Sequence, residues 1–190
     1  MNYGRFASYE DFLKELEQFH GKMAPGGVLG LQMVNLAWEL LPPGIEMDVI
    51  CETRKCLTDA IQLLTPCTVG NHWLKVVDTG RFAAVFYDKR TGKGVRISLS
   101  TEKLKNFPVI HDWFFKLTPK KDQSLEAILG EICRAGYDIL DHRPVQVDPQ
   151  VFKPRDKTPP VVCPICGEAY PPAHGDRCRG CQGVTDGTFR

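Results

Sequence analysis

The stretch from residue 74 to residue 99, LKVVDTGRFAAVFYDKRTGKGVRISL, decides the fold of the larger part of this 190-residue chain. It contains three short runs rich in β-branched and aromatic residues, at 74–77, 82–87 and 95–99, which is typical of strands. Glycine-containing turns separate these runs. Successive strands joined by such turns pair with each other, so we predict a mainly antiparallel sheet.

Helical patterns flank this stretch on both sides. Ser8 is a helix-capping residue, and the apolar residues that follow it recur at helical spacing as far as His20. Residues 28–41 form a second, more apolar helix, and residues 125–135 an amphipathic helix that Gly136 ends. A strand at 47–51, a helix at 56–64 and a last strand at 137–140 complete the pattern. Without a regular alternation of strand and helix, it indicates an α+β fold.

The composition changes near residue 149. We predict a core domain of residues 1–148, a linker of residues 149–160 rich in proline and charged residues, and an appendage of residues 161–190. A core of about 150 residues buries enough surface to be stable, whereas a tail of about 40 residues usually requires a metal ion or disulfides.

The appendage contains two cysteine pairs with the spacing of a metal site: Cys163, Cys166, Cys178 and Cys181. Two residues separate the members of each pair, so both sulfurs face one ion. Eleven residues separate the pairs, fewer than the about 15–20 of many zinc ribbons, which favours a compact ribbon or treble-clef-like module. Four thiolates leave no open position, so we predict a structural four-cysteine zinc site. Iron in a rubredoxin-like site, or His174 in place of one cysteine, is the alternative.

Charge and hydropathy argue against several classes of protein. The formal net charge is +1, so we expect no polybasic surface for nucleic acid or membrane. No signal peptide is readable, and the longest apolar stretch, residues 28–41, is too short to span a bilayer. Eight cysteines without an export signal favour a reducing compartment. We therefore expect a soluble, cytoplasmic protein.

A second group of candidate residues lies in the core domain. His20 closes the first helix before a glycine-rich bend, where backbone amides could meet an anion; a simple helical corner is the alternative. Cys56 stands at the start of the helix 56–64, where the dipole and two basic neighbours would lower the pKa of its thiol. Asp59 follows on the same helix face, and Cys67 comes just after the helix. Taken alone, each of these two cysteines is more often a small buried residue than a reactive group.

Together, these spaced motifs resemble the family of the formylmethanofuran dehydrogenase E-subunit. The motifs are Phe19-His20-Gly21, Pro25-Gly26, Glu52-Thr53, Cys56, Asp59-Ala60-Ile61-Gln62, Cys67-Thr68, Gly70, Phe86-Tyr87-Asp88 and the segment 91–95. The resemblance covers roughly residues 12–100, and several members are similar in carrying a C-terminal zinc module.

The resemblance implies an α+β core, usually dimeric, with a crevice where the His-Gly segment meets the Cys56 helix. His20, Cys56, Asp59 and Cys67 are the candidates for that crevice. Lys22 stands where the family pattern, His-Gly-His, has its second histidine. Charged lysine has no lone pair for a metal, so a second metal in this core would use His20, Cys56 and Cys67 instead.

Three functions follow as hypotheses. The resemblance favours a metal-binding accessory protein linked to one-carbon or molybdenum/tungsten enzyme metabolism, with an unknown small ligand or metal at His20 and Cys56. It would be a homodimer, and the zinc module would contact a protein partner. The alternative is a thiol- or metal-dependent enzyme with Cys56 as nucleophile and His20 as base. The second alternative is a regulatory or nucleic-acid-binding zinc ribbon, which acidic residues around Arg177 and Arg179 argue against.

Overall fold

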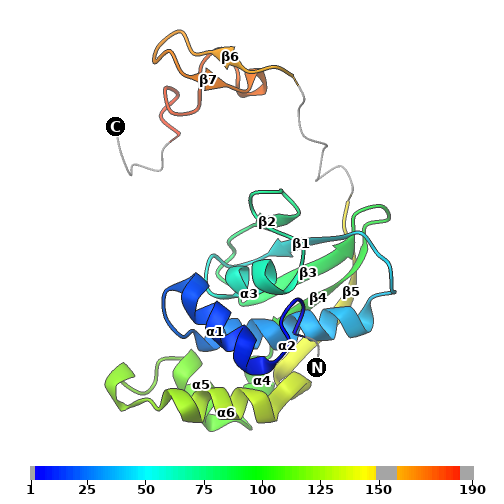
Figure 1. Cartoon of the computed structure of the whole chain (residues 1–190), viewed down its shortest axis with the longest axis vertical. Coiled ribbons are helices and arrows are strands. Elements are labelled where there is room, and N and C mark those ends of the chain that lie inside the picture. The colour runs from blue at the N-terminus through cyan, green and yellow to red at the C-terminus, as the bar shows by residue number, and fades with distance from the viewer. Residues whose placement is uncertain (1–2, 149–157, 185–190) are drawn as a thin grey trace. The chain divides into compact units, whose positions relative to one another are not determined.

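The computed structural model describes residues 3–148 and 158–184 (Figure 1). The chain divides into two compact units, Met1–Pro149 and Gln150–Arg190. Most of the predicted linker, residues 149–157, lies outside the described residues.

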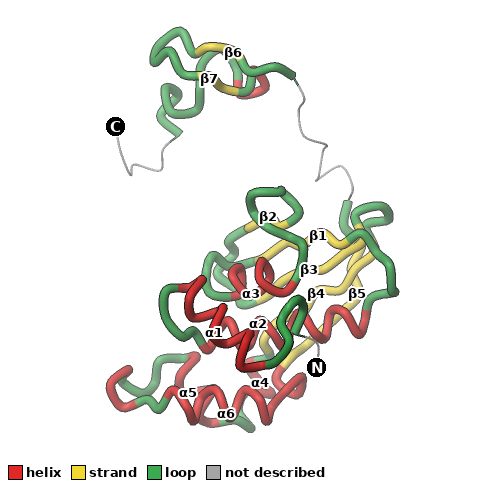
Figure 2. Tube along the Cα trace, viewed as in Figure 1, coloured by secondary structure: helices red, strands yellow, loops and turns green. Residues whose placement is uncertain are grey.

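The elements follow in chain order (Figure 2). The first unit contains α1 (Tyr9–His20), α2 (Pro25–Leu40), β1 (Met47–Cys51), α3 (Leu57–Leu64), β2 (Leu74–Val76), β3 (Ala83–Asp88), β4 (Lys93–Leu99), α4 (Thr101–Leu104), α5 (Pro108–Phe114), the 3-10 helix η1 (Lys120–Asp122), α6 (Leu125–Ala135), the 3-10 helix η2 (Gly136–Ile139) and β5 (Leu140–Gln146). The second unit contains β6 (Val161–Val162), β7 (Ala169–Tyr170) and the 3-10 helix η4 (Pro172–His174).

A five-stranded sheet forms one layer of the first unit, in the order β2-β1-β3-β4-β5. The β1–β3, β3–β4 and β4–β5 pairs are antiparallel, and β1–β2 is parallel. Val49 on β1 pairs with Phe86 on β3, which pairs with Val95 on β4. All three are buried, so this row faces the core. The predicted α+β fold with a mainly antiparallel sheet is confirmed.

The helix α2 is the centre of the helical layer, with α1, α3 and α6 packed around it (Figure 1). Its residues from Gly26 to Ala37 are all buried, and Leu29, Leu31 and Met33 have no exposed surface. Burial on every side explains why its sequence is apolar all round. An apolar helix of this kind can serve either a core or a dimer interface, and the burial of α2 places it in the core.

Two parts of the secondary structure differ from the predictions. The predicted strand at 137–140 is wrong: after Gly136 the chain forms η2, and pairing with β4 begins only at Leu140. Most side chains of β5 are exposed, so this edge strand lacks the apolar alternation that marks a half-buried strand. We predicted no element in residues 101–124, where α4, α5 and η1 lie.

Helix length and hydropathy also bear on membrane insertion. No helix within residues 3–148 or 158–184 is long and apolar enough to cross a lipid bilayer.

Candidate metal and ligand sites

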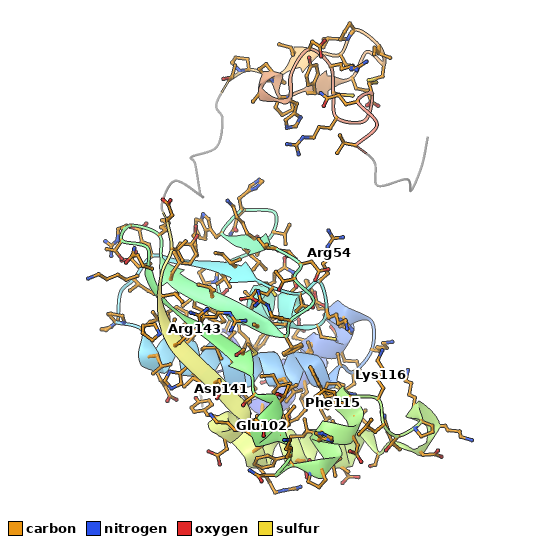
Figure 3. The ribbon with its side chains drawn as sticks, turned by 180° about the vertical axis from the view of Figure 1, so that it is seen from behind. Arg54, Glu102, Phe115, Lys116, Asp141 and Arg143 are labelled. Carbon is orange, nitrogen blue, oxygen red and sulfur yellow. The ribbon has the colours of Figure 1, made fainter. Side chains whose placement is uncertain are left out.

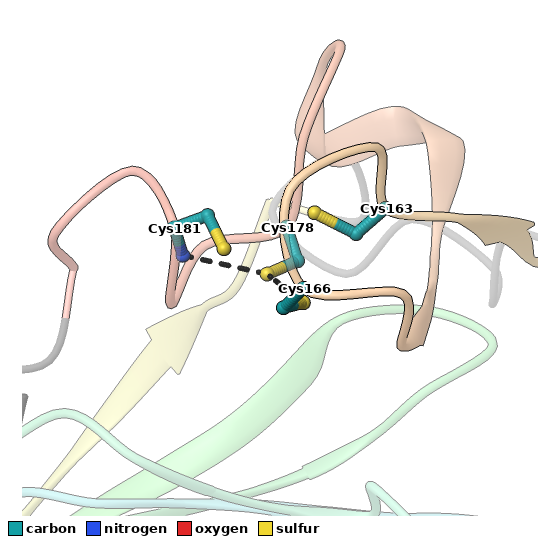
Figure 4. A group of neighbouring side chains, drawn as sticks. All are labelled: Cys163, Cys166, Cys178 and Cys181. Carbon is teal, nitrogen blue, oxygen red and sulfur yellow. Dashed lines mark hydrogen bonds between the residues drawn. The ribbon is translucent and has the colours of Figure 1, made fainter.

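The four cysteines of the second unit converge (Figure 4). All four Sγ atoms lie within 4.8 Å of one another. The Sγ atoms of Cys166 and Cys178 are 3.7 Å apart. A tetrahedral zinc ion with Zn–S bonds of about 2.3 Å would hold its sulfurs about 3.8 Å apart. The sulfur positions therefore fit a structural zinc ion held by four cysteines.

Backbone amides point at these sulfurs. The Cys181 N–H donates to Sγ of Cys178 over 3.4 Å (Figure 4). The amides of Cys166 and Cys178 lower the pKa of the Cys163 thiol to about 6. A hydrogen bond with the Cys178 side chain, which favours the protonated form of Cys181, and burial raise the pKa of Cys181 to about 12. His174 is outside the cluster; its carbonyl accepts a hydrogen bond from the Gln182 side chain.

In the first unit, three of the four candidate residues come together. Nδ1 of His20 lies 2.6 Å from Oδ2 of Asp59. Nε2 of His20 lies 3.8 Å from Sγ of Cys56. A carboxylate only accepts, so Nδ1 donates to Asp59, and in the neutral ring Nε2 is left as an acceptor facing the Cys56 thiol. Asp59 thus fixes the orientation of His20 toward Cys56.

The ends of α1 place His20. The Ser8 hydroxyl accepts from the Asp11 N–H over 3.1 Å and starts the helix. Gly21, with φ of 82°, ends it. The left-handed conformation at Gly21 is open to glycine at little cost, so the helix stops directly after His20.

Thr53 orders the loop that carries Cys56. Its hydroxyl accepts from the Lys55 N–H over 3.2 Å, and its carbonyl accepts from the Thr58 hydroxyl over 2.9 Å. Thr53 is itself buried. These bonds link the end of β1 to the first turn of α3, so the position of Cys56 is set by both elements.

Gly26, at the start of α2, makes room for the Cys56 side chain. A Cβ at Gly26 would lie 3.1 Å from Cβ of Cys56 and 3.3 Å from its Sγ. The helix also begins without a side-chain cap at Ala24. A backbone without side chain therefore approaches the thiol closely, as the glycine-rich bend suggested.

The predicted lowering of the Cys56 pKa is wrong. Burial raises the pKa of this thiol, and the positive charges of Lys22 and Lys55 offset only part of the effect. The other basic neighbour, Arg54, is highly exposed (Figure 3), and its Nε lies 3.7 Å from Oδ2 of Asp78. Cys56 is therefore a neutral thiol at pH 7 rather than a free thiolate.

Cys67 lies apart from this group. It follows the opposite end of α3, and an eight-residue helix is about 12 Å long. Its thiol is fully buried and donates to the Met47 carbonyl over 3.2 Å. Burial raises its pKa to about 11. The structure does not assemble the ligand set His20, Cys56 and Cys67.

The remaining two cysteines, Cys51 and Cys133, stand within apolar sequence patterns, which predict that both are packing residues. Cys51 is buried in β1, as expected. Cys133 is exposed on α6, and its thiol donates to the Tyr9 hydroxyl over 3.1 Å. Its position in an apolar pattern did not bury it.

A cavity of about 620 Å³ opens beside Cys56. Its walls include Gly26 and Cys56, three aromatic rings (Phe82, Trp113 and Phe114) and three lysines (Lys55, Lys116 and Lys120). Phe82 and Phe114 meet edge to face at 6.0 Å and 89°. Cys56 thus belongs both to the His20 pair and to the cavity wall.

Sequence reasoning missed half of this cavity. Trp113, Phe114, Lys116 and Lys120 come from or follow α5, within the stretch where we predicted no element. The signal was present as the aromatic run 113–115 followed by several lysines. Connecting segments often carry binding residues, so aromatic and basic side chains gathered in one such segment point to a ligand.

Comparison with solved and with curated proteins finds relatives in both. A tungsten formylmethanofuran dehydrogenase E-subunit (FmdE)-like protein from Syntrophus aciditrophicus is 44% identical over 100% of both chains, with a TM-score of 0.85. A probable S-adenosyl-L-methionine-binding protein of Archaeoglobus fulgidus is 33% identical over 105 residues, which is 50% of this chain. The chain covers 28% of that relative's length.

Two family descriptions match the two units. Residues 155–186 match the "FmdE treble clef zinc finger", in agreement with the cluster of four cysteines. Residues 19–147 match "FmdE, Molybdenum formylmethanofuran dehydrogenase operon". With this match over most of its length, the chain belongs to the FmdE family and carries that family's treble clef zinc finger at its C-terminal end.

Proposed function

We propose that this protein is a metal-binding accessory protein of one-carbon or molybdenum/tungsten enzyme metabolism, and that its core domain binds a second metal ion at Cys56 and His20. The link to that metabolism is supported by the family description and the name of the Syntrophus relative. The observation that carries the core site is the chain of contacts from Asp59 through His20 to Cys56.

The donor set suits a soft divalent cation. A thiolate and an imidazole are ligands that zinc accepts, and a carboxylate behind the histidine is the usual outer partner of such a ligand. Within the described residues the tail cysteines are the one group of three or more such side chains close enough to share an ion. The core would therefore supply two ligands and leave positions open for water or a small molecule.

Metal content per chain tests this proposal. We expect two zinc ions on the wild type after equilibration with zinc and gel filtration. The variant Cys163→Ser/Cys166→Ser should keep one, because only the tail site is lost. Adding Cys56→Ser should remove that last ion, since one imidazole alone holds zinc weakly.

Cys133→Ser, combined with the same two tail substitutions, is the matched control. This thiol is exposed on α6, so its loss should leave one ion in place. A Cys163→Ser/Cys166→Ser protein that holds no metal would refute the second metal site.

A thiol enzyme is the second candidate, favoured by the 3.8 Å approach of His20 Nε2 to the Cys56 sulfur. His20 could take the thiol proton as a general base. The raised pKa of Cys56 argues against this candidate, because a nucleophilic cysteine usually has a lowered pKa and is present as a thiolate. A core without metal in the experiment above would favour this candidate.

We also propose that the chain forms a homodimer and that the zinc module contacts a protein partner. The support for the dimer is the family resemblance. The apolar helix α2 adds no support, because its apolar surface is buried inside the core. The proposed partner contact rests on the closed four-cysteine site, which leaves the module no catalytic position.

A further inference from the structure

The cavity beside Cys56 combines two kinds of wall. The aromatic wall consists of Phe82, Trp113 and Phe114, and the lysine rim of Lys55, Lys116 and Lys120. We propose that this cavity binds an anionic nucleotide, with its base against the aromatic wall and its phosphates at the lysine rim. The proposal rests on the proposed function in one respect: it places the ligand next to the Cys56 centre.

The size of the cavity suits such a ligand. Its volume of about 620 Å³ lies inside the range of about 300–1,000 Å³ found for small-molecule sites. Such sites are mostly apolar with a few placed polar groups. Here Thr53, Thr118 and Gln123 add neutral polar groups between the rings and the lysines.

The aromatic wall is held in place by its own packing. The ring centroids of Trp113 and Phe114 are 6.2 Å apart, and Phe114 meets Phe82 edge to face. All three pack against the hydrophobic core. Fixed rings that line a cavity offer a stacking surface for a planar base, and stacking tolerates any base.

The lysine rim carries positive charge with no carboxylate beside it among the described residues. Of residues 3–148 and 158–184, no aspartate or glutamate lines the cavity. In the part of the chain that the structure describes, Lys55, Lys116 and Lys120 form no ion pair. Ammonium groups gathered around a concave, largely apolar wall attract an anion, and phosphate is the anion that lysine commonly binds in proteins.

The loop that carries two of these lysines is ordered by its own hydrogen bonds. The Lys116 N–H donates to the Trp113 carbonyl over 3.2 Å, and the Gln123 side chain donates to the Thr118 carbonyl over 2.7 Å. Lys116, marked in Figure 3, has φ of 57°, a conformation uncommon for residues other than glycine. The lysines are therefore presented by a formed turn.

The start of α2 adds to the positive electrostatic potential in the cavity. Gly26 lines the cavity, and this 16-residue helix begins there without a side-chain cap. The partial positive charge of a helix N-terminus favours anions. The lysines and the helix end thus favour the same charge in one cavity.

Calorimetry on the full zinc-loaded chain tests the proposal with ADP, adenosine and inorganic phosphate. We expect ADP to bind about a hundredfold more tightly than adenosine, because only ADP reaches both walls, and inorganic phosphate to bind more weakly than ADP. Lys116→Ala and Lys120→Ala should each weaken ADP about tenfold. Neither should change adenosine binding.

Lys121→Ala is the matched control. It removes the same charge from the same 3-10 helix, but Lys121 does not line the cavity. The proposal is overturned by equal affinity for ADP and adenosine, by equal losses in Lys120→Ala and Lys121→Ala, or by no ADP binding up to about 1 mM.

His20→Ala separates this inference from the metal proposal. The variant should lose the core metal, because Cys56 alone holds zinc weakly, and keep ADP binding, because His20 does not line the cavity. If the wild-type core holds no metal but ADP still binds through the lysine rim, the metal proposal fails and this inference stands.

Discussion

At the scale of single residues, Glu52 shows how the sheet fixes the loop that carries Cys56. Its oxygens lie 2.6 and 2.9 Å from Nε and Nη2 of Arg96 on β4, and Arg81 approaches within 2.9 Å. Glu52 is 7% exposed, and its bond to Arg96 lowers its pKa. Glu52 directly follows β1 and precedes Thr53, so this point of the chain is tied to β4, two places away from β1 in the sheet.

Glu52→Gln should lower the free energy of unfolding by about 1.5–3 kcal/mol at pH 7, the range for a hydrogen bond to a charged group. Because the pKa of Glu52 is lowered in the folded state, its contribution is present above the unfolded value of about 4.3 and is lost as the pH falls further. Urea unfolding at several pH values should show the two proteins converging below about pH 4.

Glu102→Gln is the control for that measurement. Its pair with Lys105 is exposed, at 79% for the glutamate side chain, so the change should stay within about 0.5 kcal/mol. If Glu52→Gln lowers the free energy of unfolding by the same amount at pH 7 and at low pH, the charge of Glu52 does not contribute to stability.

How far single residues could be predicted depends on sequence distance. The four tail cysteines were predictable because the two members of each pair are close in the sequence. Four cysteines with this spacing most commonly form a structural zinc site. The contact between His20 and Asp59 joins residues that are 39 positions apart in the sequence. No local sequence pattern shows that two such distant residues are in contact. The pKa of Cys56 was predicted wrongly because basic neighbours are visible in sequence, whereas burial is not.

At the scale of elements, the contact between α2 and α3 depends on a residue without a side chain. A Cβ on Gly30 would lie 2.4 Å from Cβ of Ala60 and 3.3 Å from a methyl of Leu57. The Ala60 methyl already fills this space, so α2 has no room for a side chain at Gly30. The close approach brings the start of α3, with Cys56, against the start of α2.

Gly30→Ala should destabilise the core by about 1–3 kcal/mol, because the added methyl overpacks a buried contact. Gly130→Ala on α6 is the matched control. Its Cβ would meet only the end of the Arg134 side chain at 3.5 Å, so replacing a helical glycine should stabilise by about 0.5–1 kcal/mol. Urea unfolding measures both. A Gly30→Ala protein as stable as the wild type would contradict the close packing.

Elements were predictable where their own sequence marks their ends. The helices α1 and α6 have serine caps and glycine stops, and both appear where the pattern placed them. The strand β5 and the short helices α4 and α5 carry weaker marks. They are defined by their neighbours: β5 by pairing with β4, and α5 by packing on α6.

At the scale of the whole molecule, the two units differ in what stabilises them. The first unit has a large hydrophobic core around α2. In the second unit, Cys163 and Tyr170 are the buried hydrophobic residues of its described part. Its fold therefore depends on the metal, and structural zinc contributes on the order of 10–16 kcal/mol in comparable small modules.

Complete removal of the metal by a strong chelator should unfold the second unit and leave the first folded. Trypsin should then cut at Arg177 and Arg179 within the module, while Arg134, exposed on α6, stays uncut. Mass spectrometry identifies the fragments, and added zinc should restore protection. A tail that resists trypsin after verified metal loss would show that the sulfurs do not hold its fold.

The parallel pairing of β1 and β2 gives the arrangement around Cys56 a broader meaning. The path from β1 through α3 to β2 is a β-α-β unit set into an otherwise antiparallel meander. In nucleotide-binding α/β proteins, ligands gather where the carboxyl end of a parallel strand meets the amino end of its crossover helix. Cys56 occupies that point. This chain thus contains a single β-α-β crossover within an antiparallel sheet, and the Cys56 thiol lies at the sheet edge that this crossover creates.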